Sequence, residues 1–249
     1  MSQGIFGLLL VLGPFILLQR RLHWEIQAIF LILTRRQDIA IVLFSLLFLP
    51  GVLIHELSHF LMARILGVRT GRLSVIPRPM ADGRLQLGYL ETSRVDFLRD
   101  ALIGIAPLIF GGFFIGYIAL EPLGIPNYWT GLTGVNPDEV RQGLVGIFSR
   151  ADFWVWFYLA FAISSTMMPS RSDRRGWLPV GLLVITLLLI GIALGAGPWI
   201  FQQASSLVER IILAIIFVFG TGLVVHLALL IPVMLLRSLL LKLTGTKIV

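Results

Sequence analysis

The chain of 249 residues contains no cysteine, which excludes disulfide bonds, cysteine-ligated zinc and iron–sulfur clusters. Charge is also scarce, because only 13% of the residues are charged, against about 25% in average soluble proteins. In their place, 57% of the residues are hydrophobic and the mean hydropathy is +0.93. One soluble core of this length does not bury so much apolar surface. The composition therefore excludes a soluble globular enzyme and predicts a multi-pass integral membrane protein.

Acidic residues are fewer than basic residues, 13 against 20, so the net charge is +7. The lysines and arginines cluster at the ends of apolar runs, where membrane topology places them. No basic face or aromatic platform accompanies them. We therefore expect no nucleic-acid partner and take the lipid bilayer as the surroundings of the chain.

Long polar segments are few, and we expect an all-α polytopic membrane protein with about six transmembrane helices. One apolar run, residues 22–34, is too short for an ordinary span, so it is predicted to lie in the interface or to re-enter the membrane. In the run at 39–68, Pro50-Gly51 is expected to kink or break the helix. The apolar runs are residues 4–19, 22–34, 39–68, 97–120, 152–168, 177–196 and 211–236.

The polar stretch between residues 68 and 97 lacks helical periodicity. Alternating side chains at 85–91 predict a short membrane-associated β-hairpin there. Arginines concentrate in this stretch and in the loop at 170–176, whereas the loops at 121–151 and 198–209 carry few basic residues. The positive-inside rule therefore places the hairpin, the loop at 170–176 and the C-terminus in the cytoplasm. The two arginine pairs near the N-terminus do not fit this alternation.

Only four histidines are present, and two of them form the pattern His55-Glu56-Leu57-Ser58-His59. On a helix, positions i and i+4 share a face, so both imidazoles can bind one Zn²⁺ ion while Glu56 reaches a zinc-bound water as general base. An accidental HExxH is expected in roughly one in a thousand chains of this composition. Ionisable residues within an apolar segment are costly and are functional candidates by default. The pattern therefore predicts a catalytic zinc site.

Zinc needs at least one more protein ligand. A histidine six residues after His59 is absent, because Ile65 stands there, which excludes the extended metzincin pattern. Asp173 is the preferred ligand, because its loop lies at the cytoplasmic end of a span, at a similar membrane depth to the two histidines. Three further candidates stay open: Glu91, Glu25 and His226. For the last of these, a helix–helix hydrogen bond is the favoured role.

Three stretches of the chain resemble the site-2 protease family of intramembrane zinc metalloproteases. The first is residues 50–68, where HExxH is followed by Ala63-Arg64 and Gly67-Val68. The second is the Gly-Ile-Ala-Pro-Leu element at 104–108, and the third runs from Pro169 to Asp173. The third departs from the family pattern, which has asparagine where Thr166 stands and glycine where Arg174 stands. The resemblance covers roughly residues 39–176.

This resemblance implies an intramembrane zinc endopeptidase in which His55, His59 and Asp173 hold Zn²⁺ and Glu56 is the catalytic general base. Its partners are membrane-anchored protein or peptide substrates, cleaved in or near their transmembrane segments. The active site is expected nearer the cytoplasmic face. Together with the apolar runs, it predicts that the chain has three parts. Residues 1–38 form an N-terminal span plus the interfacial or re-entrant segment. Residues 39–176 form the metalloprotease core, and residues 177–249 form two additional spans and a cytoplasmic tail.

Substrate contacts are predicted in two places. Thr166 is the first candidate to replace the family's asparagine in binding substrate, with Ser165 or Arg171 as alternatives. The strand-like segment carrying Leu85, Leu87 and Tyr89 is predicted to pair with an unwound substrate by β-augmentation. The alternative is a hairpin that merely packs on the membrane interface.

Other functions stay open from the sequence. The main one is a catalytically silent membrane scaffold or interaction protein that retains the protease fold, which the altered Thr166 and Arg174 positions favour. The second alternative is a transporter in which the histidines line an ion path, although the sequence shows no repeat symmetry to support it. A membrane metalloprotease with a downstream glutamate as zinc ligand is a third.

Overall fold

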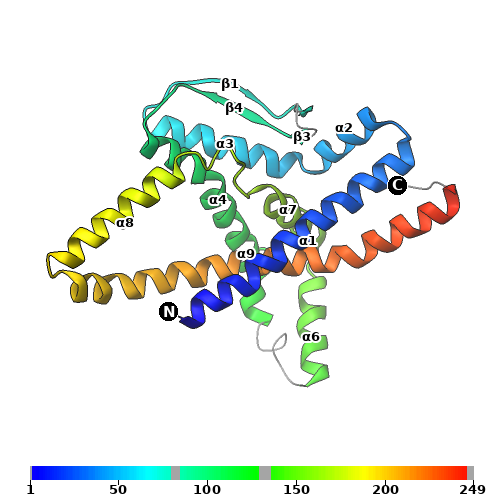
Figure 1. Ribbon diagram of the computed structural model, residues 1–249. Coiled ribbons are helices and arrows are strands. Elements are labelled where there is room, and N and C mark those ends of the chain that lie inside the picture. The colour runs from blue at the N-terminus through cyan, green and yellow to red at the C-terminus, as the bar shows by residue number, and fades with distance from the viewer. Residues whose placement is uncertain (1, 80–84, 129–135, 246–249) are drawn as a thin grey trace.

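The structure, a computed structural model, describes residues 2–79, 85–128 and 136–245 and is mostly helical (Figure 1). Three helices are long and apolar enough to cross a membrane, and two bent helix pairs raise the number of candidate spans to as many as five. The three long helices are α1 (Ser2–Thr34), α4 (Phe97–Leu120) and α9 (Gly197–Thr244). The bent pairs are α2 (Gln37–Leu47) with α3 (Leu49–Ile65), and α6 (Pro137–Phe148) with α7 (Phe153–Thr166). In the part of the chain that the structure describes, these three to five candidate spans indicate a multi-pass membrane protein, where about six spans were predicted.

Helix α1 is continuous through the first arginine pair, so the predicted division into a span at 4–19 and a separate segment at 22–34 is wrong. The reason is local neutralisation of charge. Arg21 Nη2 lies 2.7 Å from Glu25 Oε1, one helical turn away, and Arg237 from α9 pairs with the other carboxylate oxygen. Paired charges of this kind can stay inside a long helix without breaking it.

The predicted break in the run at 39–68 is confirmed, and it lies at Phe48. Helices α2 and α3 meet there at 68°, and Pro50 occupies the first turn of α3, where a missing backbone N–H costs no helical hydrogen bond. The hydroxyl of Tyr158 donates a hydrogen bond to the carbonyl of Leu47 at 2.9 Å, which satisfies an acceptor at the end of α2. The bend thus fixes the direction in which α3 carries the HExxH residues.

A β-hairpin between the HExxH helix and the next span is confirmed, although its strands reach well beyond residues 85–91. Strand β1 (Thr70–Ser74) pairs antiparallel with β4 (Tyr89–Thr92), and β2 (Arg78–Pro79) pairs antiparallel with β3 (Leu85–Gln86). The register shifts between Thr70 and Leu73, which marks a bulge or irregularity in the ladder. Figure 1 shows the hairpin lying along α3, on the side away from α9.

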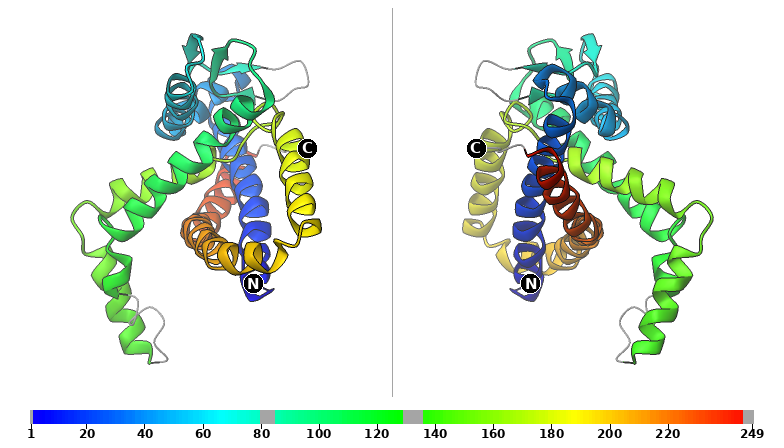
Figure 2. Two further views of the ribbon diagram at one scale, coloured as in Figure 1. Left: turned by 90° about the vertical axis from the view of Figure 1, so that its left-hand side faces the viewer. Right: turned by 90° about the vertical axis from the view of Figure 1, so that its right-hand side faces the viewer.

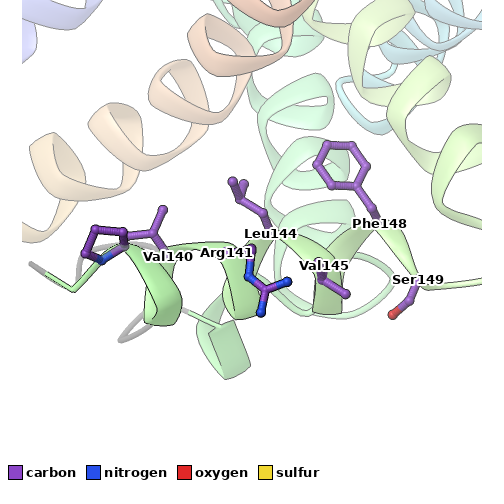
Figure 3. Close-up of a pocket in the computed structure, with 7 residues that line it drawn as sticks. Val140, Arg141, Leu144, Val145, Phe148 and Ser149 are labelled. Carbon is purple, nitrogen blue, oxygen red and sulfur yellow. The ribbon is translucent and has the colours of Figure 1, made fainter.

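Two predicted loops are helical. The loop at 121–151 contains α6, whose first turn is capped by Asn136 accepting a hydrogen bond from the backbone of Asp138 at 3.0 Å. The loop at 198–209 is the beginning of α9, where Pro198 fits the first turn. Apolar residues at helical spacing form one side of α6 and border a hollow of about 540 Å³ (Figure 3). The residues that line it are Pro137, Val140, Arg141, Leu144, Val145, Phe148 and Ser149.

The helices share one buried core, in which α4 and α7 also contact α9. Helix α1 crosses and packs against α9, while α3, α4 and α7 pack together beneath the hairpin (Figures 1 and 2). The shorter apolar helix α8 (Trp177–Ala193) follows the loop that carries Asp173. Gly51 allows α3 to approach α7 closely, because a Cβ there would overlap the carbonyl oxygen of Ala162. This close packing brings α3 against the end of α7, where the candidate site lies.

Candidate metal centre

Helix α3 presents the two histidines of the HExxH pattern on one face. His55 Nε2 and His59 Nε2 lie 3.2 Å apart, as expected for side chains one helical turn apart. His59 is buried with 7% of its surface exposed, and His55 is half-buried. The two imidazoles therefore converge at the bottom of a shared pocket.

The other ring nitrogen of each histidine faces a backbone carbonyl. His55 Nδ1 lies 2.7 Å from the oxygen of Thr166, and His59 Nδ1 lies 2.8 Å from the oxygen of Ile103. A carbonyl oxygen only accepts, so each Nδ1 carries the proton and donates it. In a neutral imidazole this leaves the lone pair of Nε2 free for a metal ion, the arrangement that outer partners of metal-binding histidines create.

Asp173 lies on the loop between α7 and α8 and faces both histidines. Its Oδ2 is 3.6 Å from His55 Nε2 and its Oδ1 is 3.5 Å from His59 Nε2. The backbone N–H of Ser170 donates to Asp173 Oδ2 at 2.7 Å, which fixes the carboxylate in place. On the other side Gly104 of α4 admits the loop, because a Cβ there would overlap the carbonyl oxygen of Asp173.

These ligand atoms lie within 4.8 Å of one another, and the group could hold a metal ion. Two imidazole nitrogens and one carboxylate match the three-ligand set of zinc sites that keep a coordination position open. Burial raises the pKa of the Asp173 carboxyl, but the adjacent imidazoles of His55 and His59 and the hydrogen bond from Ser170 outweigh it and hold that pKa well below its usual range. The carboxylate is therefore charged and available as a ligand at neutral pH.

Glu56 lies beside the histidines and is almost fully buried, with 5% of its surface exposed. The hairpin segment between β3 and β4 passes directly over it. A Cβ on Gly88 would lie 2.8 Å from both Cγ and Oε1 of Glu56 and 2.9 Å from Val52 Cγ1. Only glycine lets the backbone at position 88 approach the Glu56 side chain this closely.

A cavity of about 740 Å³ joins these residues. Its walls come from α3, from the hairpin, from α4 and from the end of α7 with the following loop. Three of the predicted substrate-binding residues, Thr166, Leu87 and Tyr89, line it. Leu85 pairs through its backbone with Pro79, and its side chain lies outside the described part of the structure.

The predicted role of Thr166 changes with its surroundings. Its hydroxyl donates to the carbonyl of Ala162, within its own helix, at 3.0 Å. Its backbone oxygen is the partner of His55. The backbone of Thr166 therefore orients His55, a candidate metal ligand, and its hydroxyl proton is not directed at the cavity.

The alternative ligands lie elsewhere. Glu25 pairs with arginines between α1 and α9, Glu91 Oε2 accepts from the backbone of Arg72 at 3.2 Å, and His226 lies beside Ser165. Within the described residues, the histidine–aspartate group on α3 and the α7–α8 loop is the only one of its kind. His226 makes the predicted helix–helix contact, since its Nε2 lies 3.1 Å from Ser165 Oγ of α7.

Sequence reasoning missed three kinds of contributor to the site. The carbonyl groups of Ile103 and Thr166 carry no sequence signal, because every residue has one. Asp100 and Arg175 line the cavity, but in the sequence they stand among ordinary helix-end charges. Gly88 had a weak signal, as a glycine interrupting an alternating strand pattern marks a close approach.

Comparisons with protein-family models, with curated proteins and with solved structures found no match. The geometry of the candidate metal centre, and not a known relative, therefore carries the functional argument.

Proposed function

We propose that the chain is an intramembrane zinc endopeptidase, similar to the site-2 proteases, that hydrolyses peptide bonds in or near transmembrane segments of membrane-anchored substrates. One observation carries the proposal. The three metal-ligating groups and the buried carboxylate of Glu56 meet in a single cavity that also reaches a β-strand. A structural zinc site is closed by four protein ligands, and it needs neither a carboxylate between the two histidines nor a cavity of this size.

The residues divide the chemistry between them. His55, His59 and Asp173 would hold zinc, which when bound polarises a carbonyl and acidifies water. Glu56 accepts a proton from the water that attacks the carbonyl carbon, and it returns that proton to the nitrogen as the C–N bond breaks. Its burial excludes bulk water from the carboxylate, which keeps the proton transfer local.

A substrate helix must unwind before it can be cut, because its amides are held in i→i+4 hydrogen bonds. The hairpin supports this step. Its segment from Leu87 to Tyr89 lines the cavity above Glu56, where an extended peptide could add a strand. The arginine-rich loop beside Asp173 supports placing the site nearer the cytoplasmic face.

The test is a zinc measurement paired with a cleavage assay on the full chain purified in detergent. We expect about one zinc per chain by elemental mass spectrometry, and cleavage of a reporter peptide that contains a transmembrane segment. The Glu56→Gln variant should keep its zinc and lose about 10²–10⁴-fold in cleavage rate, because it removes only the general base. Asp173→Ala and His59→Ala should lose both zinc and cleavage.

Two results would overturn the proposal. The first is a protein without zinc after purification free of chelators. The second is cleavage that persists in Glu56→Gln, which would assign it to a contaminating protease. Zinc retained without any cleavage of several transmembrane reporters would favour the silent scaffold.

A further inference from the structure

We propose that Arg171 and Arg175 select substrates carrying an acidic side chain beside the cleaved segment. This inference deepens the proposed function and rests on it. Both arginines line the cavity that contains the metal-ligating group. They stand two residues to either side of Asp173 on the same loop and share its cavity, in which the scissile bond would lie.

The two arginines are available to a ligand. Both side chains are exposed, and within the described residues neither forms an ion pair or a side-chain hydrogen bond. Arg174, between them, differs because its Nε donates to the carbonyl of Ser170 at 3.2 Å, and it does not line the cavity. The side chain of Arg174 is thus bonded within the loop, whereas those of Arg171 and Arg175 remain available to a ligand in the cavity.

The charge balance of the cavity favours an anion. Outside the metal-ligating group and Glu56, its charged lining residues are the two arginines and Asp100 of α4. A bound Zn²⁺ would be balanced by the carboxylates of Asp173 and Glu56, which leaves one net positive charge. A guanidinium binds a carboxylate through two parallel hydrogen bonds, a geometry that an amide or an ammonium on the substrate cannot reproduce.

The rest of the lining is suited to a membrane segment. Val52, Leu87, Ile103 and Met168 supply apolar surface, and Tyr89 adds an aromatic ring. Most transmembrane helices carry lysine or arginine at their cytoplasmic ends, and the two cavity arginines would repel those ends. The site therefore fits an apolar segment that bears an aspartate or glutamate near its cytoplasmic end, and it rejects ordinary basic-flanked helices.

The experiment measures binding separately from hydrolysis. Zinc-loaded Glu56→Gln protein, full length and in detergent, is titrated with three fluorescent transmembrane peptides that differ only in one flanking residue, Glu, Gln or Lys. We expect the Glu peptide to bind about tenfold more tightly than the Gln peptide, and the Lys peptide to bind most weakly. Adding Arg171→Gln and Arg175→Gln together should bring the three affinities close to one another, and zinc content should be unchanged.

Arg174→Gln is the matched control, since it removes the same charge from the same loop at a residue that does not itself line the cavity. It should leave the preference for the Glu peptide intact. Equal binding of the three peptides, a preference that survives the double variant, or a preference lost equally in Arg174→Gln would each overturn the inference. Wild-type protein that shows the preference but cleaves none of the peptides would instead overturn the proposed hydrolysis.

Discussion

At the scale of single residues, Gly88 sets the distance between the hairpin and Glu56, the proposed general base. Gly88→Ala places a Cβ 2.8 Å from the Glu56 carboxylate, so the carboxylate must shift. We expect the cleavage rate to fall about tenfold or more, because misplacing a catalytic group by about 1 Å costs up to 10²-fold. Zinc content should not change. Gly116→Ala is the control, since a Cβ there meets nothing within 4 Å, and equal rates for both variants would contradict this role.

At the scale of elements, the last turn of α7 is held by two other helices. From α1, Gln19 Nε2 donates to the carbonyl of Ser165 at 2.6 Å. From α9, His226 Nδ1 donates a hydrogen bond to the carbonyl of Gly222 in the same helix at 2.7 Å. Its Nε2 is therefore unprotonated and accepts a hydrogen bond from Ser165 Oγ at 3.1 Å. The next residue, Thr166, orients His55. Helices outside the predicted metalloprotease core therefore support the candidate metal centre.

Ser165→Ala tests this support. It leaves the buried His226 acceptor unpaired, so we expect a loss of about 1–3 kcal/mol in the free energy of unfolding. Because the end of α7 also loosens, zinc affinity should fall up to about tenfold, the lower end of effects from outer partners of metal ligands. Ser164→Ala is the matched control, since that hydroxyl bonds only within α7. Unchanged zinc affinity in Ser165→Ala would show that the Ser165–His226 contact stabilises the fold only and does not support the candidate metal centre.

At the scale of the whole molecule, patterns that are local in sequence were predictable and long-range partners were not. The HExxH face follows from helical spacing, and the hairpin follows from alternation between two apolar runs. The continuity of α1 did not follow, because Arg237 comes from a distant segment and neutralises Glu25 only once the chain has folded. Asp173 was predictable from its position after a span, whereas the carbonyl groups that orient the histidines have no sequence signature.

The contact between α1 and α9 contains this buried carboxylate, paired with Arg237 of α9. Glu25 is fully buried, and the guanidinium carbons of Arg21 and Arg237 lie 4.9 and 4.8 Å from the ring centre of Trp24. Glu25→Gln leaves Arg237, 18% exposed, without a counter-charge. Arg21 is about half exposed, so water screens its interaction with Glu25 and its loss adds little to the change in stability. We expect a loss of about 3 kcal/mol in the free energy of unfolding, the cost of breaking a buried pair from one side.

Thermal unfolding of the detergent-solubilised chain measures this change, with Asp38→Asn as the control. Asp38 pairs with Arg36 at 2.6 Å, but both side chains are 64% exposed, so its loss should change the melting temperature little. Below the lowered melting temperature Glu25→Gln should retain its zinc, because the ion cluster contacts none of the metal-ligating residues. Equal melting temperatures for the two variants would show that packing alone, without the ion cluster, holds α1 against α9.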